Sequence, residues 1–129
     1  MDWVLVEREQ FVRMCEKLGV STNVREAIKF WAPSVRRCET TRQKLAYRSP
    51  KNRYEAWVAR IPNPDVNKGK SGGYRIVFFL DITERSINLD FIEERDHLGF
   101  KNESIRKKQK YNDYIANVKK ELSRRDPLE

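Results

Sequence analysis

The chain has 129 residues, of which 39% are hydrophobic and 36% are charged. Three Trp, five Tyr and six Phe supply apolar surface for a core, which excludes an intrinsically disordered chain and fits one compact domain. The 27 Lys and Arg against 19 Asp and Glu give a net charge of +8 at pH 7. This excess indicates a polyanionic partner, with nucleic acid favoured over a membrane surface.

The cysteine and histidine content excludes two further classes. Cys15 and Cys38, with a single histidine, can form neither a disulfide scaffold nor a zinc finger. Both cysteines lie on apolar stripes of helical spacing, so we expect them to be small buried hydrophobes. The longest apolar stretch, residues 76–80, is far shorter than the roughly 20 residues that span a bilayer, and no signal peptide is evident. We therefore expect a cytoplasmic protein without a membrane segment or a metal site.

The N-terminal part of the chain predicts one strand and then helices. Residues 3–6 form a short β-prone run. Residues 7–18 carry apolar side chains at helical spacing, and Gly19 is expected to end that helix. Asn23 and Glu26 have the spacing of a capping box and predict the start of a second helix.

In the middle of the chain the hydrophobic pattern changes from helical spacing to the alternation typical of strands. Helical spacing continues over residues 35–45 until the turn-forming residues 49–52 interrupt it. Strands are then predicted over residues 54–61, 74–81 and 86–92. The second of them is apolar on both faces, which is typical of a central strand covered on both sides. The third is predicted to alternate, with Ile87, Leu89 and Phe91 on one face and Asn88 and Asp90 on the wetter face.

The C-terminal part predicts one long helix over residues 103–124. Tyr111 and Tyr114 lie on its apolar stripe, where we expect core packing rather than stacking on a base. The order of elements predicts a single α+β domain over residues 1–129. Its N-terminal helices pack on a mostly antiparallel sheet of three to four strands, and residues 101–125 form a basic C-terminal helix.

The basic charge is unevenly distributed. Residues 34–60 hold eight basic and two acidic side chains, and residues 101–125 hold nine and three, whereas residues 1–33 are neutral. Solvated helix faces explain part of this pattern, but basic residues within strands need another reason. Trp57, on the first predicted middle strand, could face either RNA or the core. The candidate RNA-binding residues are Arg60, Lys101, Lys107 and Lys108.

The glycine-rich segment over residues 67–75 is the most informative stretch. Lys68 and Lys70 alternate with glycines and lead into a strand whose second residue is Arg75. Glycines let the backbone approach a ligand closely, and successive N–H groups can bind an anion. The segment is not a P-loop, because that spacing is absent and a strand follows. A flexible hairpin loop with solvated lysines is the alternative.

Arg75 stands in an otherwise apolar strand. Its guanidinium must therefore reach a carboxylate, a phosphate or the open face of the sheet. Arg60 and Arg95 lie near the ends of the adjacent strands, and a meander would bring the three arginines and the two loop lysines to one concave face. Ordinary ion pairs are the alternative, Arg60 with Glu55 and Arg95 with one of its acidic neighbours.

Residues 68–78, Lys-Gly-Lys-Ser-Gly-Gly-Tyr-Arg-Ile-Val-Phe, resemble the K-x-K-S-x-G-Y-R-hydrophobic signature of the RelE/HigB branch of the RelE/ParE toxin superfamily. The predicted order of elements is also similar to that fold. The resemblance implies the toxin of a type II toxin–antitoxin system, with a cognate antitoxin protein as its partner. It implies a metal-independent endoribonuclease, or mRNA interferase, that needs no cofactor and cleaves mRNA on the ribosome.

The resemblance also implies roles for individual residues. Lys68 and Lys70 match the loop lysines, Arg75 matches the strand arginine at the scissile phosphate, and Arg95 matches the arginine after the last strand. His97 is the candidate acid or base, and an exposed loop histidine is the alternative. A ribose 2′-hydroxyl would attack its own phosphate, the arginines would stabilise the phosphorane, and a lysine or another weak base would accept the proton.

The charge around Arg95 differs from that of RelE-like toxins and leaves two other functions open. The acidic residues at 93, 94 and 96 differ from the basic character of RelE-like toxins there, and they would repel RNA or pair with Arg95. The second hypothesis is a ParE-like toxin that binds DNA gyrase and catalyses no reaction. The third is a non-catalytic RNA-binding domain of the same fold. Lys68, Lys70 and Arg75 favour the ribonuclease, because ParE-like proteins largely lack this basic set.

Overall fold

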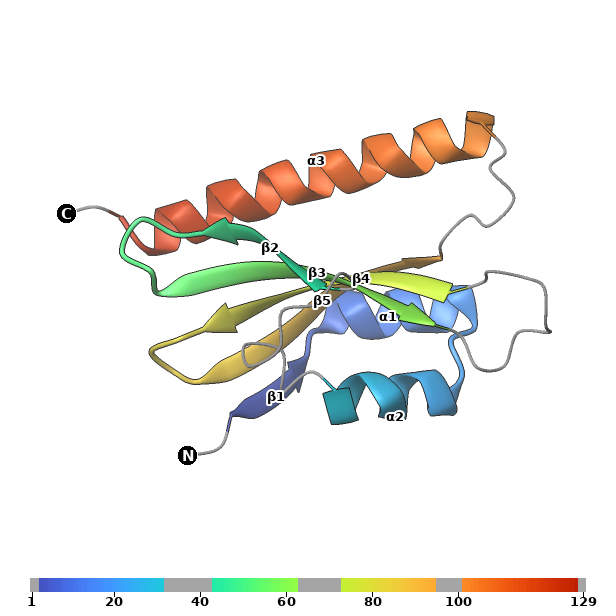
Figure 1. Cartoon of the computed structure of the whole chain (residues 1–129), viewed down its shortest axis with the longest axis horizontal. Helices are drawn as coiled ribbons and strands as arrows, with labels where there is room; N and C mark the ends of the chain where they lie inside the picture. The colour runs from blue at the N-terminus through green and yellow to red at the C-terminus, as the bar shows by residue number, and fades with distance from the viewer. Residues whose placement is uncertain (1–2, 32–42, 63–72, 95–100, 128–129) are drawn as a thin grey trace.

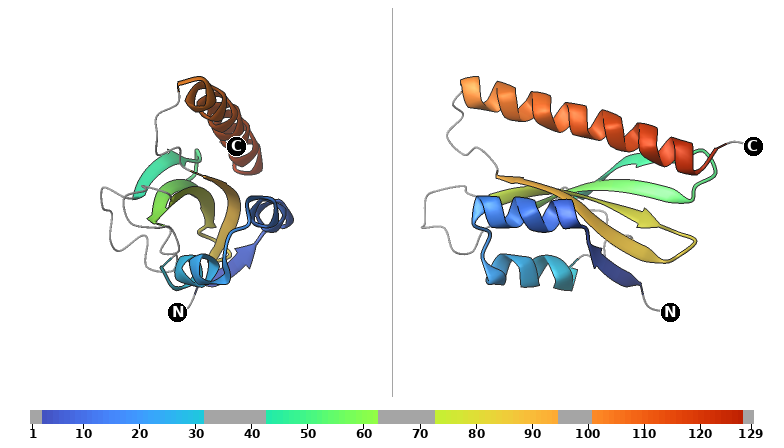
Figure 2. Two further views of the ribbon diagram at one scale, coloured as in Figure 1. Left: turned by 90° about the vertical axis from the view of Figure 1, so that its right-hand side faces the viewer. Right: turned by 180° about the vertical axis from the view of Figure 1, so that it is seen from behind.

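A five-stranded mixed sheet forms the middle of three layers. The computed structural model describes residues 3–31, 43–62, 73–94 and 101–127. Helices α1 and α2 cover one face of the sheet, and the long helix α3 lies along the other (Figure 1). The end-on view in Figure 2 separates these layers. The predicted α+β class with a C-terminal helix is confirmed.

The strands are ordered β1-β5-β4-β3-β2, with β1 parallel to β5 and the other pairs antiparallel. None of the helices in the described residues is long and apolar enough to cross a membrane. The elements in chain order are β1 (Val4–Glu7), α1 (Glu9–Leu18), α2 (Thr22–Trp31), β2 (Gln43–Arg48), β3 (Tyr54–Pro62), β4 (Gly73–Asp81), β5 (Ser86–Glu94) and α3 (Lys101–Arg125).

The N-terminal helices begin and end largely where the sequence predicts. Gly19 ends α1 with a φ of 68°, a left-handed conformation that glycine adopts without a steric penalty. The predicted capping box at Asn23 is wrong, because α2 already begins at Thr22. Ser21 provides the cap, and its hydroxyl accepts a hydrogen bond from the Val24 N–H at 3.3 Å.

Strand β2 corrects the prediction for residues 35–45. The helical spacing there does not continue through Leu45, which lies in β2 and pairs with Trp57 of β3. Residues 32–42, including Cys38, lie outside the described part of the chain. With β1 and β2 included, the sheet has five strands rather than three to four. Cross-strand pairing and packing against the core outweigh a short helical pattern here.

The larger core lies between the sheet and helices α1 and α2. Phe11 and Cys15 of α1 and Ile28 of α2 pack there against alternate residues of β4 such as Phe78. Trp57 is buried in this core, so it does not face the opposite side of the sheet. The predicted burial of Cys15 is confirmed, and burial raises the pKa of its thiol to about 11.

A β-bulge in β5 breaks the strict alternation that the sequence predicts. Val77 pairs with Phe91 and Phe78 pairs with Leu89, so the register leaves Asp90 without an opposite residue in β4. Leu89 remains in the larger core, whereas the Phe91 ring stacks on Tyr114 of α3. The prediction that Phe91 shares a face with Leu89 is therefore wrong, and the bulge turns both Asp90 and Phe91 toward α3.

Helix α3 packs on the second face of the sheet through a smaller core. Val118 and Leu122 are buried there against Phe79 of β4 and neighbouring residues of β3. The end of the helix is tied to the β2–β3 turn by the buried Asp126. Its carboxylate accepts hydrogen bonds from the Ser49 hydroxyl at 2.6 Å and from the Lys51, 2.8 Å, and Arg53, 3.3 Å, N–H groups.

Candidate nucleic-acid interface

Two arginines and one glutamate form a row across three adjacent strands. Arg60 of β3 lies directly opposite Arg75 of β4, and Arg75 lies directly opposite Glu93 of β5. Residues paired in this way point to the same face of the sheet, with Cβ atoms about 5 Å apart. The row lies on the α3 face, because Tyr74 and Ile76 on either side of Arg75 belong to the core beneath α1 and α2.

Arg75 has contacts on two sides. Its Nε donates a hydrogen bond to Glu93 Oε2 at 2.6 Å, and its Nη2 forms an ion pair with the same carboxylate oxygen. The Tyr111 ring of α3 covers the guanidinium, whose Cζ lies 3.7 Å from the ring centroid, a cation–π contact. The Arg75 side chain keeps 30% of its surface exposed and Glu93 keeps 11%. One edge of the guanidinium is thus neutralised, and part of it still reaches solvent.

The two tyrosines of α3 hold the helix above this row. The rings of Tyr114 and Phe91 stack with centroids 4.3 Å apart, and Tyr111 packs against Phe91 at 6.3 Å. Burial raises the pKa of Tyr111, and burial together with the Asp90 carboxylate raises that of Tyr114, so both phenols stay protonated near neutral pH. The predicted core packing is confirmed for Tyr114, which lies against the smaller core. The half-buried Tyr111 contacts Phe91 and Arg75 and belongs to neither core within the described residues.

Arg60 is exposed. Glu55, the alternative ion-pair partner that the sequence offers for it, binds other residues. Glu55 is buried on the opposite face of β3, where it accepts hydrogen bonds from Arg48 Nε at 3.3 Å and Trp57 Nε1 at 3.1 Å. The alternative of an Arg60–Glu55 ion pair is therefore wrong. Among the residues that the structure describes, Arg75 is the charged residue that the sheet register sets directly opposite Arg60.

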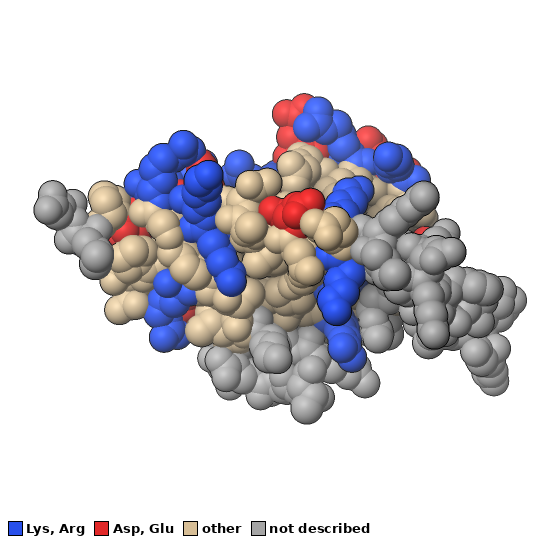
Figure 3. Space-filling view, turned by 90° about the horizontal axis from the view of Figure 1, so that it is seen from above, with Lys and Arg blue, Asp and Glu red and all other residues tan. Residues whose placement is uncertain are grey.

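The predicted helical lysines lie along α3. Lys108 is exposed one turn before Tyr111, and Lys101 and Lys107 belong to the first turns of the helix, where side chains are outside the described part. Seen from above α3, Lys and Arg side chains gather in several groups, with fewer Asp and Glu between them (Figure 3). Exposed basic residues of the helix include Lys110, Lys119, Lys120 and Arg124.

Four of the predicted site residues lie outside the described part of the chain: Lys68, Lys70, Arg95 and His97. Their segments join elements that meet at one end of the sheet. Pro62 pairs with Gly73, and Tyr74 pairs with Glu94, so β3 ends, β4 begins and β5 ends side by side. The row of Arg60, Arg75 and Glu93 lies one or two residues inside that end.

Sequence reasoning missed two members of this site, Glu93 and Tyr111. The sequence offers Glu93 only as one of three acidic neighbours that could pair with Arg95, whereas the register of β4 and β5 places it opposite Arg75. Tyr111 was assigned to the core by its helical spacing, which carries no information on where α3 crosses the sheet. An arginine and a glutamate near the facing ends of two consecutive predicted strands were the available signal.

The site can bind an anion by charge and by hydrogen bonding. Two guanidinium groups face one carboxylate in the row, which leaves one net positive charge, and within the described residues no hydrogen bond or ion pair involves the Arg60 guanidinium. In the described residues, no three His, Cys, Asp or Glu side chains lie close enough to hold a metal ion. Comparison of the chain with protein-family models, with curated proteins and with solved structures finds no match.

Proposed function

We propose that this protein binds RNA across Arg60 and Arg75 and cleaves mRNA, as the toxin of a type II toxin–antitoxin pair. One observation carries the proposal: two arginines lie directly opposite each other in adjacent strands, with a single carboxylate beside them. Like charges in this arrangement destabilise a sheet, and a phosphate between them would remove the repulsion. The net charge of +8 favours the same ligand.

The sheet topology supports the second part of the proposal. The two segments that carry Lys68, Lys70, Arg95 and His97 join elements at the end of the sheet where Arg75 lies. In the proposed reaction the ribose 2′-hydroxyl attacks the adjacent phosphate, and Arg75 and Arg95 stabilise the charge of the phosphorane. A loop lysine accepts the 2′-hydroxyl proton and His97 protonates the leaving oxygen. The resemblance of residues 68–78 to RelE-like toxins supports these roles.

A second candidate is RNA binding without cleavage, and the Arg75–Glu93 ion pair favours it. Glu93 occupies the Nε edge of Arg75 and would compete with a phosphate for that guanidinium. Binding would then depend on Arg60 and on the lysines of α3, with Arg75 serving mainly to fix the sheet. The two candidates predict different consequences for cellular mRNA.

Inducible expression of the parent chain and of Arg75→Gln tests the proposal. Gln still donates a hydrogen bond to Glu93, so the variant keeps that carboxylate satisfied while it removes the positive charge. Arg13→Gln is the matched control, because Arg13 is exposed on α1, which covers the opposite face of the sheet. Growth is recorded and the ends of cellular mRNA are mapped, with circular dichroism of each purified variant as the check on folding.

The proposal predicts growth arrest and new mRNA ends for the parent and for Arg13→Gln, and neither for Arg75→Gln. Growth arrest with intact mRNA and trapped DNA gyrase would favour the ParE-like reading instead. RNA binding without new mRNA ends would favour the non-catalytic candidate. Cleavage by Arg75→Gln at the parent rate would contradict the assignment of Arg75.

A further inference from the structure

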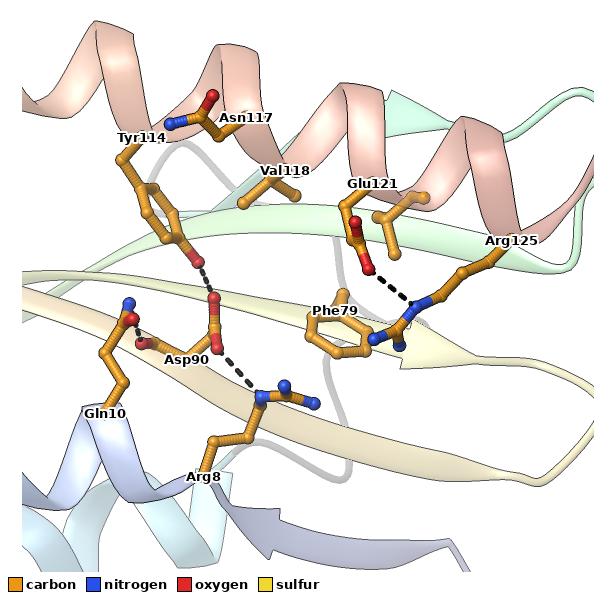
Figure 4. A pocket seen from close by; sticks show the side chains of 10 residues that line it. Arg8, Gln10, Phe79, Asp90, Tyr114, Asn117, Val118, Glu121 and Arg125 are labelled. Atoms are coloured by element: carbon orange, nitrogen blue, oxygen red, sulfur yellow. Dashed lines mark hydrogen bonds and ion pairs between the residues drawn. The ribbon is translucent and has the colours of Figure 1, made fainter.

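A pocket of about 370 Å³ lies beneath the C-terminal half of α3, apart from the Arg60–Arg75 row (Figure 4). The start of α1, strands β4 and β5 and helix α3 line it, and it is open to solvent. Phe79 on its floor is four residues along β4 from Arg75 and on the same face, a distance of about 13 Å. Its lining includes Arg8, Phe79, Asp90, Val118, Leu122 and Arg125.

Arg8 is fixed at one side of this pocket. Its Nε forms an ion pair with Asp90 Oδ1 at 3.0 Å, and its Cζ lies 5.4 Å from the centroid of the Phe79 ring. The bulge turns Asp90 toward α3, and the Tyr114 hydroxyl donates to its second carboxylate oxygen. Gln10 Nε2 donates to the Asp90 main-chain oxygen at 3.2 Å. The Asp90 carboxylate is therefore used by Arg8 and Tyr114.

Arg125 is fixed at the other side in the same way. Its Nε donates to Glu121 Oε1 at 3.2 Å, and the second oxygen of Glu121 binds Arg124. Figure 4 shows the guanidinium groups of Arg8 and Arg125 pointing into the pocket toward the Phe79 ring from two sides. Each arginine side chain is 41% exposed.

Both arginines use the Nε edge for a carboxylate and leave the Nη atoms for a ligand. Within the described residues, neither pair of Nη atoms has a hydrogen bond or ion pair. A guanidinium held by its Nε edge presents a rigid fork of donors, which matches the oxygens of a phosphate or carboxylate. One fork satisfies both oxygens of a carboxylate, whereas two forks suit the three terminal oxygens of a phosphate monoester.

The floor of the pocket is apolar. Phe79, Val118 and Leu122 belong to the small core beneath α3 and form it. An inorganic anion would bind to the two guanidinium groups and leave the apolar floor uncovered. A ligand that also carries an organic group would cover the floor. We propose that the pocket binds a phosphate monoester of nucleotide size. Arg8 and Arg125 hold the phosphate oxygens, and the organic group lies over Phe79 and Val118.

Calorimetric titration of the full chain tests this site, with adenosine 5′-monophosphate, inorganic phosphate and adenosine as probes. Arg125→Gln removes the charged donors, and Arg125→Lys keeps the charge without the two-pronged guanidinium. Arg125 is exposed, so both variants should retain the fold. Arg124→Gln is the matched control, because Arg124 binds the same Glu121 but does not line the pocket. Arg60→Gln controls for binding at the row on β3 and β4.

We expect the mononucleotide to bind at least about tenfold more tightly than inorganic phosphate, and adenosine not to bind. Arg125→Gln and Arg125→Lys should each weaken the mononucleotide by about tenfold or more, since a bidentate charged contact is lost. Arg124→Gln should stay within about twofold of the parent. Equal weakening by Arg124→Gln, loss only in Arg60→Gln, binding of adenosine alone, or no binding at millimolar mononucleotide would overturn the proposal.

Discussion

Glu93→Gln should strengthen RNA binding at the Arg60–Arg75 row. Glu93 neutralises one of the two guanidinium groups, and its carboxylate is largely shielded from solvent. Gln has nearly the same size and its side-chain oxygen can still accept a hydrogen bond from Arg75 Nε, so the geometry of the row is retained. The net charge of the row rises from one to two.

The magnitude follows from Coulomb's law. A carboxylate and a phosphate oxygen on opposite edges of one guanidinium are roughly 7 Å apart, given hydrogen bonds of ordinary length on both edges. Their repulsion is about 0.6 kcal/mol at the dielectric constant of water and about 2.4 kcal/mol at an effective value near 20. Removing it should therefore tighten binding by about threefold to sixtyfold.

Fluorescence anisotropy with a labelled single-stranded RNA measures this change at fixed salt. Glu84→Gln is the matched control, since Glu84 is exposed in the turn between β4 and β5 and the substitution removes the same charge. The control should change affinity by less than about twofold because salt screens a charge that distant. Unchanged or weaker binding by Glu93→Gln would refute an RNA site at Arg75.

Four further expectations concern stability, titration and salt. The hydrogen bond from Ser49 is the main cause that lowers the pKa of Asp126, so the stability it contributes is fully present above its ordinary value of 3.8 and is lost as the pH falls through the lower folded pKa. Thermal unfolding from pH 6 to pH 2 should therefore show a smaller acid loss for Asp126→Asn than for the parent or for the exposed control Asp113→Asn. Leu122→Ala should lower the free energy of unfolding in urea by about 2–5 kcal/mol, because it opens a cavity between α3 and the sheet, whereas Lys119→Ala should stay within about 0.5 kcal/mol. Cys15, buried and with a pKa near 11, should react with iodoacetamide at pH 8 only after unfolding. The logarithm of RNA affinity should fall with the logarithm of salt by about 0.7 per phosphate contact, and a flat response would contradict binding through these arginines.

Hydrophobic periodicity is sufficient to predict the long strand β4 and the long helix α3. The apolar pattern of β4 and the helical stripe of α3 have no competing interpretation, and both elements are found within two residues of their predicted bounds. Strand β2 was missed because its few apolar residues also fit a helical spacing, and its pairing with β3 is a contact distant in sequence. The bulge at Asp90 shifts the later part of β5 by one residue, which a strictly alternating pattern cannot express.

The sequence predicts that Arg75 lies in a strand of the sheet, but it does not identify the residues that contact Arg75. Arg75 was found because a cation in an apolar strand needs a specific reason, and its need for a carboxylate or phosphate is met by Glu93. That partner depends on the register of two strands, and Tyr111 depends on where α3 crosses the sheet. The pocket at Arg8 and Arg125 could not be anticipated either, because it joins residues from opposite ends of the chain.

Cleavage of a defined mRNA by the purified protein in a translation extract tests the central claim most directly. The cut site is mapped first, and the same mRNA is then prepared with a single 2′-deoxynucleotide on the 5′ side of the cut. Attack by the ribose 2′-hydroxyl, with Arg75 stabilising the transition state, predicts that the deoxy substitution and Arg75→Gln each abolish the cut, while Arg13→Gln leaves it unchanged. Cleavage of the deoxy-substituted mRNA at the parent rate, or no cleavage of any mRNA that the protein binds, would contradict the claim.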